Sequence, residues 1–290
     1  MNQGATVALL GKAPCQGDFI RWNAGDAVSQ QFHRWLEEGH EAVRRANVLL
    51  PAEPIHFVFT AAGARQALVG LMAPSSDKVG RVFPLAVYLL VDTSALAGHA
   101  NVLLPGSHEA FFAGARKLLA DAATLSADEL HKRLEALAAQ TAGDSGAAEA
   151  YRRKAQLAPA SSLVRQFTSD GAPPGVQYYA FRTFMTACSA EKGKEPSKPG
   201  VTLDCPFPEE TGPFPWVELA RRLLLSLGPP SSSVLLHLAK PEHSSMKLWP
   251  LRTKQPNAIE TAKNALSAAQ RRVLEDETTT AEALIGAFGP

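Results

Sequence analysis

Cysteine is scarce in this sequence of 290 residues, and its scarcity limits the class of protein. Cys15, Cys188 and Cys205 are odd in number and far apart, so they cannot form the framework of a disulfide-rich secreted domain. Isolated thiols of this kind are typical of proteins in a reducing compartment. The cysteines therefore predict a cytoplasmic protein without disulfide bonds.

Long hydrophobic runs and an export signal are also missing. The longest apolar runs, at residues 85–91 and 217–227, fall far short of the ~20 residues that a membrane-spanning helix needs. The first residues show neither a basic start, nor an apolar stretch of signal length, nor a small-residue cleavage site. These absences agree with a cytoplasmic location and predict no membrane insertion.

Neither sign of charge is in excess. Lysine and arginine number 29 against 28 aspartates and glutamates, a net charge of +1, so no basic field favours a nucleic-acid partner. Hydrophobic residues make up 46% and charged residues 20% of the chain, which is ordinary for a folded globular protein. We therefore expect one large domain or two modest ones.

The hydrophobic pattern of the first half predicts grouped strands between helices. The expected strands cover residues 6–10, 55–61, 67–72 and 82–91, the last being the most apolar and therefore central. Asp26 is expected to cap a helix, and Ser126 and Glu129 form a capping-box pattern before another. The helix after Asp26 carries an apolar stripe of Val28, Phe32, Trp35, Leu36, Gly39 and Val43. Further helices are expected over residues 109–120 and 127–140.

The second half is expected to be an α/β region that follows a connecting segment. The predicted domains are residues 1–142, a connection over 143–175, and a C-terminal half over 176–290. Its predicted strands cover residues 176–186, 201–205, 233–238 and 246–251, and its helices 215–226, 257–274 and 281–288. We predict an α+β fold, a largely antiparallel mixed sheet flanked by helices in a three-layer α/β/α sandwich, with a first half similar to the longin or roadblock arrangement.

Signatures of catalysis are missing from the sequence. Gly11 and Lys12 lack the upstream glycine and the following Ser or Thr of a phosphate-binding loop, and no nucleophile elbow occurs. The histidines include no His-Glu-x-x-His pattern, and the cysteines no Cys-x-x-Cys. His33 and His40 are seven residues apart on one helix, about 10 Å along its axis, too far to hold one zinc ion together. We therefore expect no enzyme, no cofactor and no metal site.

Two polar loops carry the candidate functional residues. The first, residues 11–21, reads GKAPCQGDFIR, and the second, residues 74–84, reads PSSDKVGRVFP. The candidates are Lys12, Gly17, Asp18, Phe19, Arg21, Ser76, Asp77, Gly80, Arg81 and Phe83. One interpretation is turn chemistry, in which the aspartates accept backbone hydrogen bonds and the phenylalanines enter the core. The other is a recognition site, or a group of charges around a small anion.

The expected strand directions bring the two loops together. If strands 6–10 and 82–91 are antiparallel neighbours, the end of one lies beside the start of the other. Asp18 would then pair with Arg81, adding ~1 kcal/mol or less to stability. Burial of Phe19 and Phe83 would anchor the loops, with roughly 1.5–3 kcal/mol from each.

Both loops resemble the TagF family, also called ImpM. The resemblance rests on residues 11–14 and 17–21, on Trp35 and Leu36, and on residues 74–85. It implies a cytoplasmic accessory protein of bacterial type VI secretion, a post-translational repressor that binds the forkhead-associated scaffold protein. Two alternatives stay open: a structural accessory subunit without repressor activity, and an enzyme with an anion-binding site.

Trypsin should cut first within residues 191–200. This stretch holds Lys192, Lys194 and Lys198 and has no large apolar side chain to bury, so it should form an exposed, mobile loop. Brief digestion followed by mass spectrometry of the fragments will locate the first cut. Early cleavage close to residues 82–91 would contradict the strand assignment there.

Overall fold

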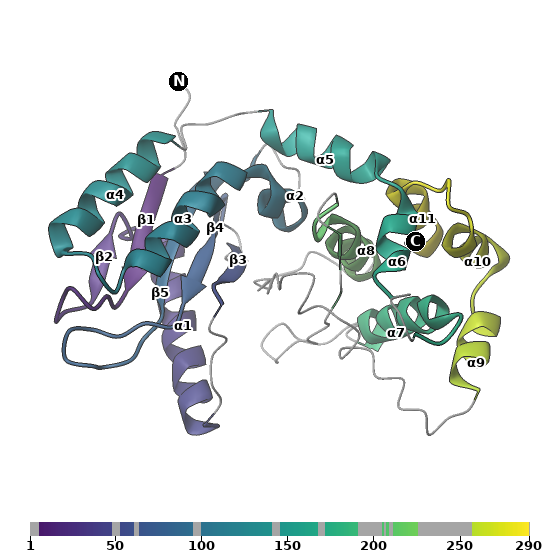
Figure 1. Ribbon diagram of the computed structural model, residues 1–290, viewed down its shortest axis with the longest axis horizontal. Helices are drawn as coiled ribbons and strands as arrows, with labels where there is room; N and C mark the ends of the chain where they lie inside the picture. Colours follow the sequence, from purple (N-terminus) through teal and green to yellow (C-terminus); the bar gives the residue numbers. More distant parts are fainter. Residues whose placement is uncertain are drawn as a thin grey trace. The chain divides into compact units, whose positions relative to one another are not determined.

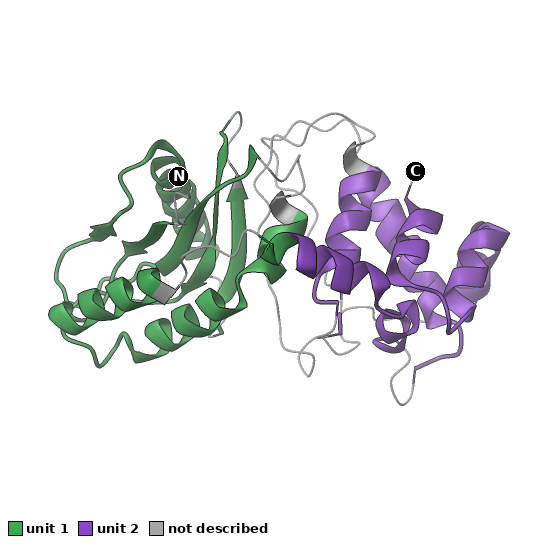
Figure 2. Cartoon of the chain, turned by 90° about the horizontal axis from the view of Figure 1, so that it is seen from above, with its two compact units in different colours: residues 1–148, 232–238 green, residues 149–231, 239–290 purple. Residues whose placement is uncertain are grey.

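The computed structural model describes residues 6–47, 53–60, 64–94, 100–140, 146–167, 172–190, 205, 207–208, 211–225 and 257–289. These residues divide into two compact units, the first ending at residue 148 and the second following it (Figure 2). None of the described helices is both long enough and apolar enough to cross a membrane.

The first unit is built on a five-stranded antiparallel sheet with the order β2-β1-β5-β4-β3 (Figure 1). Its strands are β1 (Thr6–Gly11), β2 (Ile20–Trp22), β3 (Ile55–Thr60), β4 (Gln66–Ala73) and β5 (Leu85–Asp92). The most apolar strand, β5, lies at the centre, as its sequence predicts. The short β2 was not predicted: its first two residues, Ile20 and Arg21, fall in the stretch expected to be a loop.

Helices cover both faces of this sheet. The helices of the first unit are α1 (Ala27–Arg45), α2 (Ala100–Ser107), α3 (Glu109–Asp121) and α4 (Ala127–Gln140). Because strand side chains alternate between faces, Leu9, Val69 and Val87 pack under α3 and α4, whereas Leu10, Leu68 and Tyr88 pack under α1. This arrangement is a three-layer α/β/α sandwich, and it confirms the α+β class.

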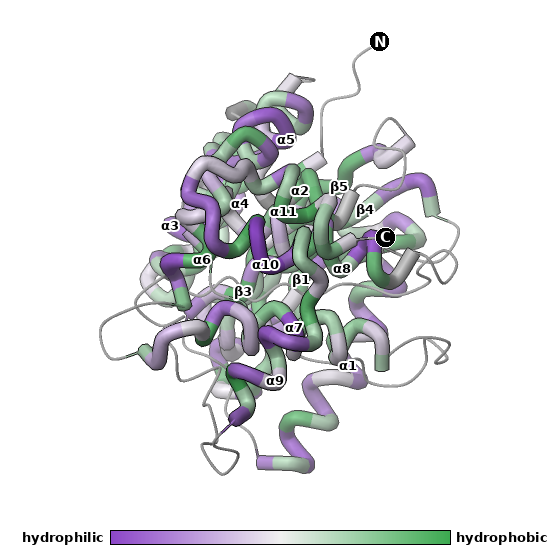
Figure 3. The backbone as a smooth tube through the Cα atoms, turned by 90° about the vertical axis from the view of Figure 1, so that its right-hand side faces the viewer, coloured by the Kyte–Doolittle hydropathy of each residue, from purple (hydrophilic) through white to green (hydrophobic). Residues whose placement is uncertain are grey.

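Helix α1 is held in place by its N-cap. The Asp26 carboxylate accepts the backbone N–H of Ser29 at 2.8 Å and its hydroxyl at 2.5 Å, and the buried Tyr88 hydroxyl donates to Ser29 Oγ at 2.9 Å. Burial raises the pKa of Tyr88. Further along, Phe32 stacks on Phe57 with ring centroids 4.7 Å apart. Along α1, hydrophilic residues alternate with the hydrophobic residues that pack on the sheet (Figure 3).

The described part of the second unit is helical. Its helices are α5 (Ala147–Leu157), α6 (Ala160–Arg165), α7 (Val176–Ala190), α8 (Phe214–Leu225), α9 (Ala258–Ala265), α10 (Ala268–Glu275) and α11 (Ala281–Phe288). Phe181 lies at the centre of the core, with its ring centroid 4.9 Å from those of Trp216 and Phe288. The predicted helices at 215–226 and 281–288 are confirmed.

Several predictions for the second half are wrong. The strand expected at 176–186 is α7, whose buried side chains recur at the three- and four-residue spacing of a helix. The long helix expected at 257–274 breaks because Ser267 caps α10 in a capping box with Gln270. The segment 143–175, predicted as the connection, contains the helices α5 and α6, which the sequence pattern did not predict.

Four further predictions fall on parts that the structure leaves undescribed. Apart from Cys205, the expected strands at 201–205, 233–238 and 246–251 and the expected loop at 191–200 lie outside the described residues.

Gly70→Ala should destabilise the first unit. Gly70 of β4 pairs with Tyr88 of β5, and a Cβ atom there would lie 2.3 Å from the Val87 carbonyl oxygen. The strands would have to separate, which typically costs about 1–3 kcal/mol or more. Gly39→Ala is the matched control: it lies inside α1 with open space around its Cα, so alanine should stabilise by about 1 kcal/mol. Denaturant unfolding will measure both, and equal effects would contradict the close approach of β4 and β5.

Candidate functional site

The two polar loops lie side by side at one end of the sheet. Strands β1 and β5 are antiparallel neighbours with Gly11 opposite Leu85, so the chain leaves β1 where it enters β5. The backbone N–H of Lys78 donates to the carbonyl of Gln16 at 2.9 Å, and the guanidinium of Arg81 donates to the carbonyl of Gly17. The meeting of the loops therefore follows the predicted strand pairing.

The second loop forms a tight hairpin over residues 75–83, here called the motif hairpin. Ser76 and Val82 form an antiparallel bridge, and the backbone N–H of Asp77 donates to the carbonyl of Arg81 at 3.1 Å. Gly80 turns the chain with a φ of 84°, in the left-handed region that favours glycine. The strand predicted from residue 82 begins only at Leu85, because Val82 belongs to this hairpin and is exposed.

The carboxylate of Asp77 is the centre of the hairpin. Its Oδ1 accepts the backbone N–H groups of Val79 at 3.1 Å and Arg81 at 2.9 Å. Its Oδ2 lies 2.6 Å from Nε of Arg81 and 3.1 Å from Nζ of Lys12, and the side chain is 0% exposed. Lys12 directly follows β1 at the start of the first loop, so one buried carboxylate ties together the hairpin and that loop.

These contacts keep Asp77 ionised. Burial raises the pKa of the carboxyl, but hydrogen bonds from the Arg81 N–H, Lys12, the Arg81 guanidinium and the Val79 N–H together outweigh burial. The pKa of Asp77 therefore lies well below its ordinary value. With both oxygens occupied by donors, the group acts as a structural anchor.

The predicted pair between Asp18 and Arg81 is wrong. Arg81 instead pairs with Asp77, four residues away in the same hairpin, and Asp18 is exposed. The reason is desolvation: a buried carboxylate needs cationic partners far more than an exposed one does. Arg81 still reaches the first loop, through the carbonyl of Gly17.

Aromatic side chains anchor both loops to α1. Phe83 is buried and meets the half-buried Phe19 edge to face, with ring centroids 5.2 Å apart. His33 of α1 packs against Phe19 at 4.7 Å and His40 against Phe83 at 5.2 Å. Arg21 lies over Phe19 at 5.4 Å and donates to Nδ1 of His33 at 3.3 Å. Phe83 thus enters the core as expected, and Phe19 is partly buried against it.

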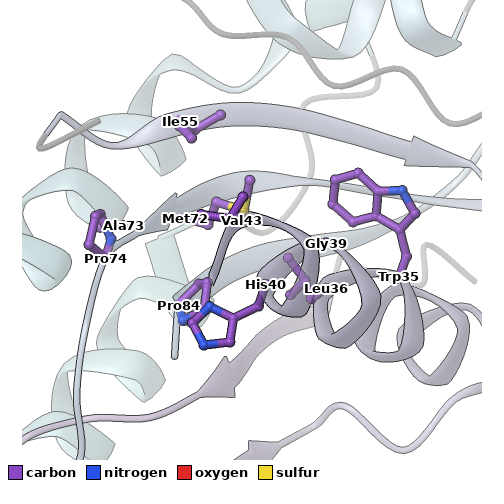
Figure 4. Close-up of a pocket in the computed structure, with 10 residues that line it drawn as sticks. All are labelled: Trp35, Leu36, Gly39, His40, Val43, Ile55, Met72, Ala73, Pro74 and Pro84. Atoms are coloured by element: carbon purple, nitrogen blue, oxygen red, sulfur yellow. The ribbon is translucent and has the colours of Figure 1, made fainter. Parts of the chain in front are cut away.

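A small apolar cavity of about 150 Å³ lies near these anchors, between α1 and the ends of β3 and β4 (Figure 4). Its walls are almost entirely apolar, and His40 lies beside Pro84 at one side of it. The Nδ1 atom of His40 is buried and has no hydrogen-bond partner among the described residues. Such a cavity can take an apolar group, and the described residues that line it include no aspartate, glutamate, lysine or arginine.

Lys78, Val79 and Val82 face solvent in the hairpin. Lys78 and Val79 were not among the predicted site residues, and Val82 was predicted to begin a core strand. The available signal was the turn chemistry of Asp77 and Gly80. An aspartate that accepts nearby backbone N–H groups, followed by a glycine, favours a tight turn, and turns lie at the surface. Among the described residues, no three His, Cys, Asp or Glu side chains gather as a metal site would require.

Comparison with known proteins finds a similarity for most of the first unit. Residues 8–137 match the TagF N-terminal domain, which is type VI secretion system-associated, and this confirms the resemblance of the two motif loops. A crystal structure of PA0076 from Pseudomonas aeruginosa PAO1 is similar, with 26% identity and a TM-score of 0.40. That similarity covers 48% of this chain and 64%, less than two thirds, of PA0076. No curated protein matches the chain.

Asp77→Asn should lower the thermal midpoint at neutral pH, because it removes the charge that Lys12 and Arg81 share. The folded pKa lies below the ordinary value of 3.8, so the stabilisation is present above about pH 4 and is lost as the pH falls further. The midpoints of wild type and Asp77→Asn should therefore converge in acid.

Asp18→Asn is the matched control for that change, since Asp18 is exposed and outside the ion pairs of the hairpin. Its midpoint should equal that of the wild type across the same pH range. Thermal scans monitored by circular dichroism will measure all three proteins. A difference for Asp77→Asn that persists undiminished in acid would contradict the central role of its charge.

Proposed function

We propose that this chain, whose residues 8–137 match the type VI secretion system-associated TagF N-terminal domain, is a post-translational negative regulator of that system. In this proposal it works in the cytoplasm by binding the forkhead-associated scaffold protein that promotes assembly. It carries no catalytic step of its own. Support comes from the domain match and from the character of the site.

One observation favours binding over catalysis: the acidic group at the centre of the motif hairpin has no free acceptor. A general base needs an accessible lone pair and a pKa near the working pH. Asp77 is buried, holds four donors on its two oxygens and has a lowered pKa. The site is therefore suited to presenting a fixed surface.

The groups around this anchor are exposed. The side chain of Arg81 is 61% exposed although it pairs with Asp77, and Lys78 and Val79 extend into solvent beside it. A rigid turn that projects polar and apolar groups loses little conformational freedom when it meets a partner. This combination is what a protein-binding loop requires.

Deleting the gene should increase secretion of type VI effectors, measured by immunoblot of the culture medium. Removal of a repressor releases the apparatus, whereas removal of a structural subunit would abolish secretion. Lost secretion would therefore contradict the proposal and favour the structural alternative. Return of the wild-type gene should restore repression.

Complementation with Arg81→Ala should restore repression only partly. The change removes an exposed guanidinium from the hairpin and frees one side of Asp77. Arg133→Ala is the matched control, because Arg133 of α4 is also partly exposed and pairs with an aspartate, Asp121. It should repress as the wild type does. Equal repression by both variants would remove the motif hairpin from the proposed mechanism.

A further inference from the structure

The motif hairpin carries an exposed apolar pair. Among the described residues the exposed large hydrophobic side chains are Val79 at 70%, Val82 at 59% and Leu157 at 63%. Two of these three lie within four residues of each other, on one turn. Single exposed apolar residues are ordinary on a protein surface. Here two of them share one short hairpin with the exposed Lys78 and Arg81.

The backbone beneath these valines is held firmly. Asp77 accepts the N–H of Val79 itself, the bridge between Ser76 and Val82 closes the hairpin, and the Lys78 N–H donates to the first loop. Side chains on such a frame are already positioned before a partner arrives. Docking therefore costs less conformational entropy than it would for a flexible loop.

The two loops carry more exposed cations than exposed acids, and two of these cations, Lys78 and Arg81, belong to the hairpin of the valines. Lys78 is exposed and has no ion pair among the described residues, and the Arg81 side chain is 61% exposed. Arg21 is exposed over Phe19 on the neighbouring loop. The charge of Asp77 is buried and matched by Lys12 and Arg81, so Asp18 is the exposed acid of the two loops. Three exposed cations against one acid favour an acidic partner.

We propose that the hairpin tip, Lys78–Val82, docks into an apolar depression bordered by carboxylates on a protein partner. This inference rests on the proposed function, which makes that partner the forkhead-associated scaffold protein. Val79 and Val82 fill the depression, and Lys78 and Arg81 meet its acidic border. The arrangement follows the usual anatomy of a binding site, an apolar centre within a polar rim.

A membrane surface fits the tip less well than a protein does. Two valines bury few methyl groups, and the tip from Lys78 to Val82 has no aromatic or leucine side chain to enter the lipid boundary. Stable attachment to a membrane takes a larger apolar face or a lipid anchor in addition to basic residues. A pocket in a protein can enclose two valines completely.

The test is calorimetric titration of the full-length chain with the purified scaffold protein. Val79→Asp should weaken binding by at least about tenfold, because it places a carboxylate in an apolar, acid-bordered site. Leu157→Asp changes an equally exposed residue elsewhere and should leave the affinity unchanged. Lys78→Glu should also weaken binding and reduce its dependence on salt. Because these positions are exposed, circular dichroism should show unchanged folding.

The outcomes separate the two levels of the proposal. Wild-type binding with full affinity for Val79→Asp and Lys78→Glu overturns the docking surface and leaves the proposed function intact. Absence of wild-type binding overturns the proposed function, and this inference with it. Sedimentation of the wild type, but not of Val79→Asp, with phosphatidylserine vesicles also overturns the inference, because a membrane would then be the occupant.

Discussion

The buried carboxylate of Asp77 holds together the part of this molecule that carries its motifs. Taking a charge out of water is unfavourable unless the protein supplies partners, and here two cations and two backbone N–H groups do so. One partner, Lys12, comes from the first loop and the others from the hairpin itself. Both loops therefore depend on a single ionised group for their shape.

The sheet makes that interaction possible. Only because β1 and β5 run antiparallel at its centre does the exit of one strand lie beside the entrance of the other. The covering helix α1 then fixes the loops from one side through Phe19 and Phe83. The inside of the motif hairpin is thus structural, and its outside is free to meet a partner. Arg81 belongs to both, since it pairs with Asp77 and is still mostly exposed.

The motif residues all belong to the first unit. The family match ends at residue 137, and the described residues after 148 form a helical core around Phe181 and Trp216. Glu218 is buried there and bonded to Arg221 and Arg222 on its own helix, so its charge is satisfied locally. The binding proposals rest on the first unit alone.

The sequence by itself determined the elements whose periodicity is strong. The stripe of α1, its Asp26 cap, the capping box of Ser126 and Glu129, and the central place of β5 all follow from local pattern. Local pattern failed at 176–186, where β-branched and aromatic residues suggested a strand but pack as α7.

Tertiary structure alone decided which charges pair. Spacing placed Lys12, Asp18, Asp77 and Arg81 near one another but could not show which carboxylate would be buried. Burial determines the pairing, because a carboxylate removed from water needs cationic partners. Lys12 and Arg81 therefore pair with the buried Asp77 and not with the exposed Asp18. It also decided that Val82, read as the start of a core strand, faces solvent beside Val79. Whether a valine is buried or exposed depends on which residues pack against it, and in a sheet protein those residues are often distant in the sequence.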